Sequence, residues 1–263
     1  MTLKKTLNQS LNLKDIARTI KSLLYTKELA VDLFIGKTNP ILMIVSTGSR
    51  SLDGILGGGI RSGMVTDFFG RSGTGKSQLC FTICVNYAKE INPGESILFI
   101  DTTGNFRPER IQEIASGKGE KDVLRKISYI RVFNSSDQSH ALSRIHGMSP
   151  KIIVVDNVSS LISNEFSGAR MHLRLMKHIH SLSLTAVTLD CAVVVTNMLR
   201  HAPYNGSLTD REFMASSISL CTHIRAKLEM ADLARLLYKA TLVHPTGPKS
   251  SFFGIKKTGI TEP

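Results

Sequence analysis

Apolar and polar positions follow two alternating patterns in the chain beyond Pro40. Short, continuous apolar runs predict buried strands, and longer segments with apolar residues three or four positions apart predict helices. The strand candidates are Val65–Phe69, Ser96–Asp101, Ile127–Phe133, Ile152–Asp156 and Ala192–Asn197. The helices expected between them are Ser77–Ile91, Arg107–Ala115, Ser136–His146 and Ala169–Leu184. Buried strands separated by helices predict an α/β fold with a mainly parallel sheet flanked by helices on both faces.

The pattern differs at the two ends of the chain. Residues 1–40 form a distinct basic segment whose apolar residues recur at helical spacing, and Asn39-Pro40 breaks the chain after it. Beyond Met198 the pattern weakens into a polar loop, which strand candidates at residues 223–229, 240–244 and 251–255 follow. We expect these strands at the edge of the sheet. The sequence therefore predicts a short helical N-terminal segment, residues 1–40, and one α/β core, residues 41–263.

Charge and cysteine content restrict the class of protein. The 263 residues include 33 Lys and Arg against 21 Asp and Glu, and the net charge of +12 suits a polyanionic partner or only a solvated basic surface. The four cysteines show no metal-binding spacing, so we expect buried thiols in a reducing compartment. No apolar run approaches the ~18 residues that span a bilayer, and the N-terminus lacks the apolar region of a secretory signal. These features predict a cytoplasmic location without a membrane partner.

One glycine-rich segment carries the strongest chemical signal. It reads G-R-S-G-T-G-K-S and matches the phosphate-loop pattern G-x-x-x-x-G-K-[ST] between a buried strand and a helix. Its residues are Gly70, Arg71, Ser72, Gly73, Thr74, Gly75, Lys76 and Ser77. The glycines let backbone N–H groups point at anionic oxygens, Lys76 supplies a charge for the outer phosphates, and the Ser77 hydroxyl can bind Mg²⁺. The alternative is a glycine-rich turn with an incidental lysine, but the full motif predicts a nucleoside triphosphate site.

A second part of this site is expected at the end of another buried strand. The run Ile152–Asp156 is apolar up to its last residue, which is acidic. In a parallel sheet the carboxyl ends of the strands line the ligand crevice, so Asp156 would hold Mg²⁺ through water. The alternative role of Asp156 is to cap the turn that follows the strand.

Several motifs in register with the phosphate loop resemble the ATPase core of RecA/RadA-type recombinases. They are Ser46–Asp53, Leu56–Ile60, Phe99–Thr102, Phe106–Ile111, Thr196-Asn197, Pro248 and Phe253–Ile255. The hexamer F-R-P-E-R-I at residues 106–111 separates this group from other phosphate-loop families, and it is most similar to the archaeal and eukaryotic branch. The resemblance covers roughly residues 41–263 and implies a RecA-like core with ATP and Mg²⁺ as cofactors.

Two further nucleotide contacts are implied by the resemblance. Arg110 would lie over the adenine ring, a placement that suits cation–π stacking, although a surface arginine on a helix is the alternative. Gln78 directly follows the phosphate loop, as in the family, and would pack near the phosphates.

The departures from the family pattern concern hydrolysis. Thr103 stands where the family has the glutamate that activates water, and a threonine hydroxyl cannot accept a proton near neutral pH. Met198 replaces a glutamine that senses the γ-phosphate, and a thioether cannot make that hydrogen bond. Val243 replaces the aspartate that caps the ATP of a neighbouring subunit. We therefore assign no catalytic residue and expect slow ATPase activity at most, unless Glu109 or Glu165 replaces the missing base.

Two segments are candidates for DNA contact. Arg170, Arg174 and Lys177 share one face of the helix expected after residue 168, opposite an apolar face, and the alternative is an ordinary solvated face. The loop from Leu199 to about Ser217 carries Arg200, Arg211 and Tyr204, which could contact the DNA backbone and stack on a base. Its Gly, Asn and Pro residues are equally typical of a plain mobile loop.

The N-terminal segment bears on assembly. It is shorter than the family's helical DNA-binding domain, and its nearest match to the family's F-x-x-A subunit hook, Tyr25–Glu28, ends in a glutamate. A pocket built for a methyl group would accept a carboxylate only at a cost. We therefore expect a monomer or small oligomer rather than long filaments.

Together these patterns predict a recombinase paralog of the RadA/RadB type. It would bind ATP and single-stranded or branched DNA, work with a main recombinase or another paralog, and assist homologous recombination and DNA repair. It would lie at the nucleoid, or in the nucleus of a eukaryote. Two alternatives stay open: a DNA-stimulated ATPase that catalyses strand exchange itself, and a KaiC-like signalling ATPase, whose lead-in resembles Leu56–Ile60.

Overall fold

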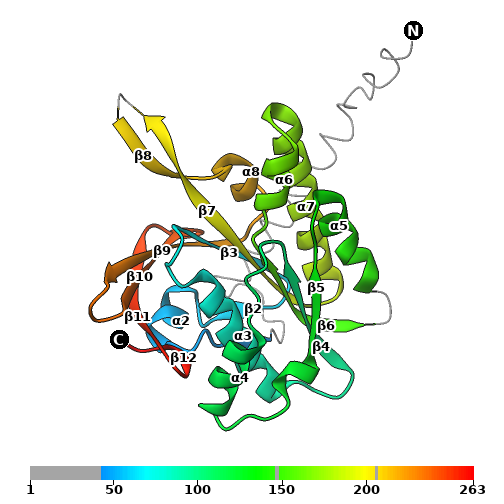
Figure 1. The fold of residues 1–263 in the computed structure, drawn as a ribbon, viewed down its shortest axis with the longest axis vertical. Helices are drawn as coiled ribbons and strands as arrows, with labels where there is room; N and C mark the ends of the chain where they lie inside the picture. The colour runs from blue at the N-terminus through cyan, green and yellow to red at the C-terminus, as the bar shows by residue number, and fades with distance from the viewer. Residues whose placement is uncertain (1–42, 146–147, 205–206) are drawn as a thin grey trace.

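The computed structural model describes residues 43–145, 148–204 and 207–263 (Figure 1). The helical segment that the sequence predicts at residues 1–40, with its hook candidate, lies outside the described residues. The described chain starts beside a small antiparallel sheet of β1 (Ile44–Val45) and β2 (Ile60–Arg61). Helix α2 (Arg50–Ile55) lies between these two strands in the sequence.

A twisted central sheet organises the rest of the chain. Its strand order is β12-β11-β10-β9-β3-β7-β6-β4-β5, and β8 pairs with β7 beyond this path. Six strands form its parallel core. They are β3 (Val65–Gly70), β4 (Glu95–Asp101), β5 (Ile127–Arg131), β6 (Ser149–Asp156), β7 (Ala192–Tyr204) and β9 (Ile224–Asp232). The antiparallel strands β10 (Leu237–His244), β11 (Lys249–Lys256) and β12 (Gly259–Thr261) extend it. The α/β fold with a mainly parallel sheet is therefore confirmed.

Helices cover both faces of this sheet, as Figure 1 shows. One face packs against α3 (Lys76–Glu90) and α4 (Pro108–Ser116), around a buried cluster that includes Phe81 and Phe99. The other face packs against α6 (Ser160–Glu165), α7 (Gly168–Thr188) and α8 (Ala215–Ser219), around a second cluster that includes Leu175 and Leu182. Shorter helical turns are η1 (Val123–Lys126), α5 (Ser135–His140) and η2 (Ala141–Ile145).

Two sequence predictions about the last third of the chain are wrong. The polar loop expected after Met198 is largely regular: β7 runs on to Tyr204 and pairs with antiparallel β8 (Ser207–Glu212), and α8 follows. The strand predicted near residues 223–229 is not at the edge, because β9 pairs with β3 on one side and β10 on the other. In both cases pairing with distant strands, which leaves little local signal, decides the structure.

The register of the parallel strands brings the candidate site together. Gly70, the last residue of β3, lies beside Met198 of β7, and Asp101 of β4 lies beside Asp156 of β6. Gly70, Asp101 and Asp156 are the last residues of their strands, and Met198 is the last residue of β7 that pairs with β3. The carboxyl ends of the strands are the edge where open α/β sheets bind ligands. The fold therefore gathers the predicted motifs at one edge of the sheet.

Candidate nucleotide site

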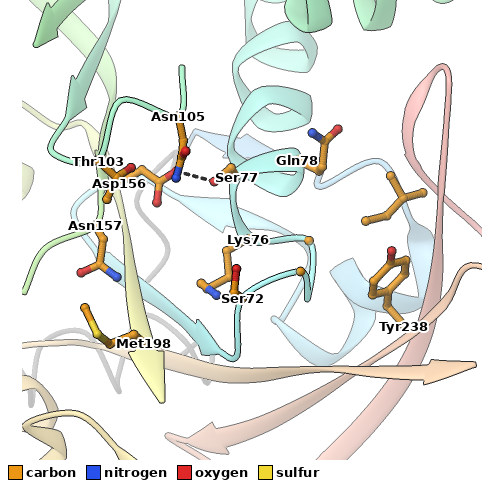
Figure 2. A pocket seen from close by; sticks show the side chains of 13 residues that line it. Ser72, Lys76, Ser77, Gln78, Thr103, Asn105, Asp156, Asn157, Met198 and Tyr238 are labelled. Atoms are coloured by element: carbon orange, nitrogen blue, oxygen red, sulfur yellow. Dashed lines mark hydrogen bonds between the residues drawn. The ribbon is translucent and has the colours of Figure 1, made fainter. Parts of the chain in front are cut away.

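A cavity of about 380 Å³ opens at this edge, and Figure 2 shows the side chains that line it. Its floor is the turn between β3 and α3, with Gly73, Gly75, Lys76 and Ser77 among the lining residues. Thr103, Asp156 and Met198 line one end, and Tyr238 and Ile255 line the other (Figure 2). The volume lies within the range of small-molecule sites.

The turn from β3 into α3 has the geometry of an anion nest. Gly75 caps the helix with φ of 89°, in the left-handed region that favours glycine, and a Cβ there would lie 2.7 Å from Ile255 Cδ1. A Cβ on Gly70 would meet the Leu228 carbonyl oxygen at 2.3 Å. Glycine is therefore needed at both positions, and the helix N-terminus with its unpaired N–H groups faces the cavity.

Lys76 sits within the curl of this turn. Its ammonium group donates to the carbonyl oxygens of Gly70 at 2.8 Å and Arg71 at 2.7 Å. Burial lowers the pKa of Lys76, and the charge of Asp156 opposes that shift. Arg71 points the other way and forms an ion pair with Asp210 of β8. Lys76 is thus the loop's cation at the cavity.

Asp156 and Ser77 lie together at the back of the cavity. The Ser77 hydroxyl donates to one carboxylate oxygen of Asp156 at 2.5 Å (Figure 2), and the Thr196 hydroxyl donates to the other. Burial raises the pKa of Asp156, while these two hydrogen bonds and Lys76 oppose the shift. One carboxylate and one hydroxyl are oxygen donors of the kind that Mg²⁺ takes together with water and phosphate oxygens. The residues present therefore fit a magnesium ion, and no cluster of three or more His, Cys, Asp or Glu marks another metal site in the described ranges.

Apart from Asp156, no carboxylate lines the cavity among the residues that the structure describes. Asp101 lies beside Asp156, but its oxygens accept the backbone N–H groups of the turn at residues 103–106. Burial alone would raise the pKa of Asp101, but these hydrogen bonds and the charge of Arg131 hold it below its usual value. Glu109 is exposed on α4, and Glu165 accepts from Ser135 at the start of α5. Neither glutamate lines the cavity.

Met198 occupies the neighbouring wall, at the point where β7 leaves the sheet. Beside it, Asn157 and Asn197 belong to a buried hydrogen-bond network through Ser159, which donates to both side-chain oxygens. Asn197 in turn donates to the carbonyl oxygen of Phe213 at 2.8 Å, on the segment that follows β8. The cavity wall is thereby joined to the base of the β7–β8 hairpin.

Arg110 does not line the cavity but holds a residue that does. Its guanidinium donates to the Gln78 side-chain oxygen at 2.7 Å and to the carbonyl oxygens of Lys256 and Lys257, and it forms an ion pair with Glu113. These contacts fix Gln78 and the end of β11. Stacking of Arg110 on a base stays a prediction.

Four lining residues were missed by reasoning from the sequence: Asn105, Asn157, Tyr238 and Ile255. Asn157 directly follows Asp156, and Asn105 lies in the turn after Thr103, so sequence proximity could have indicated both. Tyr238 and Ile255 reach the cavity because β10 and β11 join the sheet beyond β9. That placement has no local signal in the sequence.

The basic residues predicted to contact DNA are exposed. Arg170, Arg174 and Lys177 share an exposed face of α7, and Arg174 lies over the Phe166 ring at 5.2 Å. Arg200 lies directly opposite Arg211 in the β7–β8 hairpin, and it donates to Ser163 of α6. The side chain of Tyr204 falls outside those that the structure describes.

Comparison with known proteins identifies the family. The family model described as Rad51 matches residues 38–219. The chain belongs to the Rad51 family. Among curated relatives, the "DNA repair and recombination protein RadA" of Metallosphaera sedula is 38% identical over 173 residues, 60% of this chain and 53% of that protein. The RadA protein of Ignicoccus hospitalis is 36% identical over 177 residues, 60% of this chain and 54% of the relative.

A plant relative extends the likeness to eukaryotes. The "DNA repair protein RAD51 homolog B" of Zea mays is 37% identical over 168 residues, 59% of this chain and 49% of the relative. The chain thus spans about half the length of the curated relatives it matches. Its place in the Rad51 family confirms the resemblance that the F-R-P-E-R-I hexamer indicated.

Two other expectations concern the Rad51 core as a whole. Cys80 and Cys84 are buried thiols outside any disulfide, as predicted, and Cys191 and Cys221 are buried as well. Among the described residues, no helix is long and apolar enough to cross a membrane.

Proposed function

We propose that this Rad51-family chain is an ATP-binding recombinase paralog that binds DNA and assists homologous recombination and DNA repair, with weak or absent ATP hydrolysis. One observation carries the proposal: Thr103 and Met198 line the same cavity as the phosphate loop. At these two positions the family resemblance implies a base and a γ-phosphate contact. The relatives named for DNA repair and recombination support the process.

The residues of the cavity would divide the work of binding ATP. Backbone N–H groups at the start of α3 would bind the phosphates, and Lys76 would exchange its two carbonyl partners for phosphate oxygens. Ser77 and Asp156 would hold Mg²⁺, which neutralises phosphate charge when bound. Asp101 is engaged by its own turn, and Asp156, the one carboxylate that lines the described cavity, would be occupied by Mg²⁺. That would leave no carboxylate there to take a proton from water.

DNA would be bound by the basic surface above the cavity. Arg200 contacts Ser163 of α6, and α6 leads directly into the helix that carries Arg170 and Arg174. The hairpin and α7 both lie in the upper part of Figure 1, and the contact of Arg200 with α6 links them. Exposed arginines and lysines of this kind bind phosphates without reading sequence, so single-stranded or branched DNA is the proposed partner.

The proposed protein partner is a main RadA-type recombinase or another paralog, bound by a monomer or small oligomer of this chain. Val243 supports this, because it presents an exposed apolar side chain on β10 where the family resemblance implies an aspartate that caps a neighbour's ATP. A filament needs the same contact repeated at every subunit, and this substitution weakens that repeat. The proposed setting is the nucleoid, or the nucleus of a eukaryote.

The test measures binding and turnover separately. We expect the purified chain to bind ATP with Mg²⁺ in calorimetry, and to hydrolyse it well below 1 s⁻¹ with or without single-stranded DNA. We also expect no regular helical filaments in electron micrographs with a non-hydrolysable ATP analogue and long single-stranded DNA. Turnover on the order of 1 s⁻¹ or faster, together with filaments, would contradict the accessory role and favour strand exchange by this chain itself.

DNA binding has its own test. Replacing Arg170, Arg174 and Lys177 by alanine should lower the slope of log affinity against log salt by about 1 for each residue that contacts a phosphate. A matched variant removes the same charge from exposed positions elsewhere: Lys89, Lys121 and Arg125. If both variants bind single-stranded DNA equally well, the α7 face is only solvated.

A further inference from the structure

The cavity continues past the phosphate loop to an end at which the sequence motifs gave Tyr238 no role. Gln78, Tyr238 and Ile255 line this end (Figure 2). We propose that the Tyr238 hydroxyl binds the nucleoside side of the nucleotide, by a hydrogen bond to a sugar hydroxyl or to the α-phosphate. This inference rests on the proposed binding of ATP and names the residue that recognises its non-reacting half.

The direction of the nucleotide follows from the charges in the cavity. Lys76, Ser77 and Asp156 mark where the outer phosphates and their metal ion would lie. Asp156 and Thr196 are buried behind this position, so a triphosphate held there would extend toward the opposite end of the cavity. The sugar and base must therefore lie toward Tyr238 and Ile255.

The ring of Tyr238 is held firmly in place. It lies in β10, is only 6% exposed, and stacks on Phe253 with ring centroids 5.5 Å apart and planes 18° apart. Figure 2 shows its hydroxyl directed toward the side of the cavity where Gln78 lies. A rigid ring that presents one hydroxyl loses little conformational entropy on binding, which suits a positioning residue.

The Tyr238 hydroxyl is available for a hydrogen bond to a ligand. The structure gives Tyr238 no hydrogen-bond partner among the residues that it describes, whereas the Gln78 side-chain oxygen already accepts from Arg110 at 2.7 Å. Ile255 is apolar, and its Cδ1 packs over Gly75. Of the described polar groups that line this end, the tyrosine hydroxyl alone combines a free donor with a free acceptor, which is the pairing that a sugar hydroxyl requires.

The experiment compares Tyr238→Phe with the wild type, because phenylalanine keeps the stacked ring and removes only the hydroxyl. Calorimetry with Mg²⁺ and ATP should show an affinity about three- to tenfold lower for the variant, the usual effect of one hydrogen bond. Tyr87→Phe is the matched control, since its hydroxyl donates to Glu95 away from the cavity. Near-equal melting temperatures would show that the variants fold alike.

Ligand analogues separate the two possible contacts. If Tyr238 binds a sugar hydroxyl, inorganic tripolyphosphate will bind the wild type and Tyr238→Phe equally. The deoxy analogue that lacks the contacted hydroxyl, either 2′-deoxy-ATP or 3′-deoxy-ATP, will also bind the two proteins equally. If it binds the α-phosphate, the variant will lose affinity for tripolyphosphate and for both deoxy analogues alike. Equal ATP affinity of Tyr238→Phe and wild type would overturn the inference. That result is distinct from failure of ATP binding in the wild type itself, which would overturn the proposed function and this inference with it.

Discussion

The two sides of the phosphate loop have diverged in what they can do. On the binding side, Lys76, Ser77 and Asp156 are connected by short hydrogen bonds and charge. On the side where water would attack, Thr103 and Met198 present a hydroxyl and a thioether in the same cavity. The difference teaches that affinity for a nucleotide and the chemistry of its hydrolysis depend on separate residues.

The largest effect should come from removing the loop's cation. Lys76→Ala should lower the affinity for Mg²⁺ and ATP at least a hundredfold, because no other lysine or arginine lines the described cavity. Calorimetry measures the change. Lys89→Ala removes the same charge from the last turn of the same helix and serves as the control. Equal affinity of both variants would show that the nucleotide does not lie in the phosphate loop.

Introducing a general base and an amide at Thr103 and Met198 tests the proposed weakness of hydrolysis. The double variant Thr103→Glu with Met198→Gln should raise ATP turnover about tenfold or more, since a positioned general base contributes at least that much. The control is Thr103→Gln with Met198→Gln, which has the same size but cannot accept a proton. Turnover in the presence of single-stranded DNA is the measurement. If both double variants hydrolyse ATP at the wild-type rate, the loss of hydrolysis has another cause than these two positions.

Asp156 lines the cavity between the phosphate loop and Met198, and its carboxyl should make the affinity for Mg²⁺ and ATP depend on pH. Burial raises the pKa of its carboxyl, so the group gains a proton at a higher pH than an ordinary aspartate. As pH falls toward that raised pKa, the wild type should lose affinity for Mg²⁺ and ATP. Asp156→Asn should bind about tenfold more weakly at neutral pH and lack this loss.

The quantity to follow is the ratio of the wild-type affinity for ATP to that of Asp156→Asn. Protonation of the nucleotide itself affects both affinities alike and therefore does not change this ratio. It should approach one as the solution becomes more acidic. A ratio that stays constant with pH would exclude Asp156 as the metal-binding carboxylate.

The smallest effect is expected from single apolar changes on the hydrolytic side. Thr103→Ala and Met198→Leu should each leave ATP affinity within about twofold of the wild type, because neither side chain supplies charge to the phosphates. Both measurements use the same calorimetric assay. A loss comparable to that of Lys76→Ala would mean that binding and chemistry are not separated in this cavity.

The sequence was informative where the chemistry is local. The phosphate loop forms one continuous segment, and Asp156 ends an unbroken apolar strand, so the order of residues along the chain was enough to place both. The parallel sheet followed from the same apolar runs. The β7–β8 hairpin could not be predicted, because its pairing joins polar residues with no periodic signal. Tyr238 could not be predicted as a cavity residue, because its position depends on the order in which distant strands join the sheet.

Helix α3, which follows the phosphate loop, contains two buried thiols whose labelling rate would report how often the helix opens. Cys80 and Cys84 lie on its fully buried face, and burial raises the pKa of Cys84 to about 12 and that of Cys80 well above its usual value. Thiols so placed react with alkylating reagents only when the helix leaves the sheet. Their labelling rate therefore reports how often the floor of the cavity opens. A nucleotide that holds the floor shut would slow that rate in proportion to its occupancy, with no added probe.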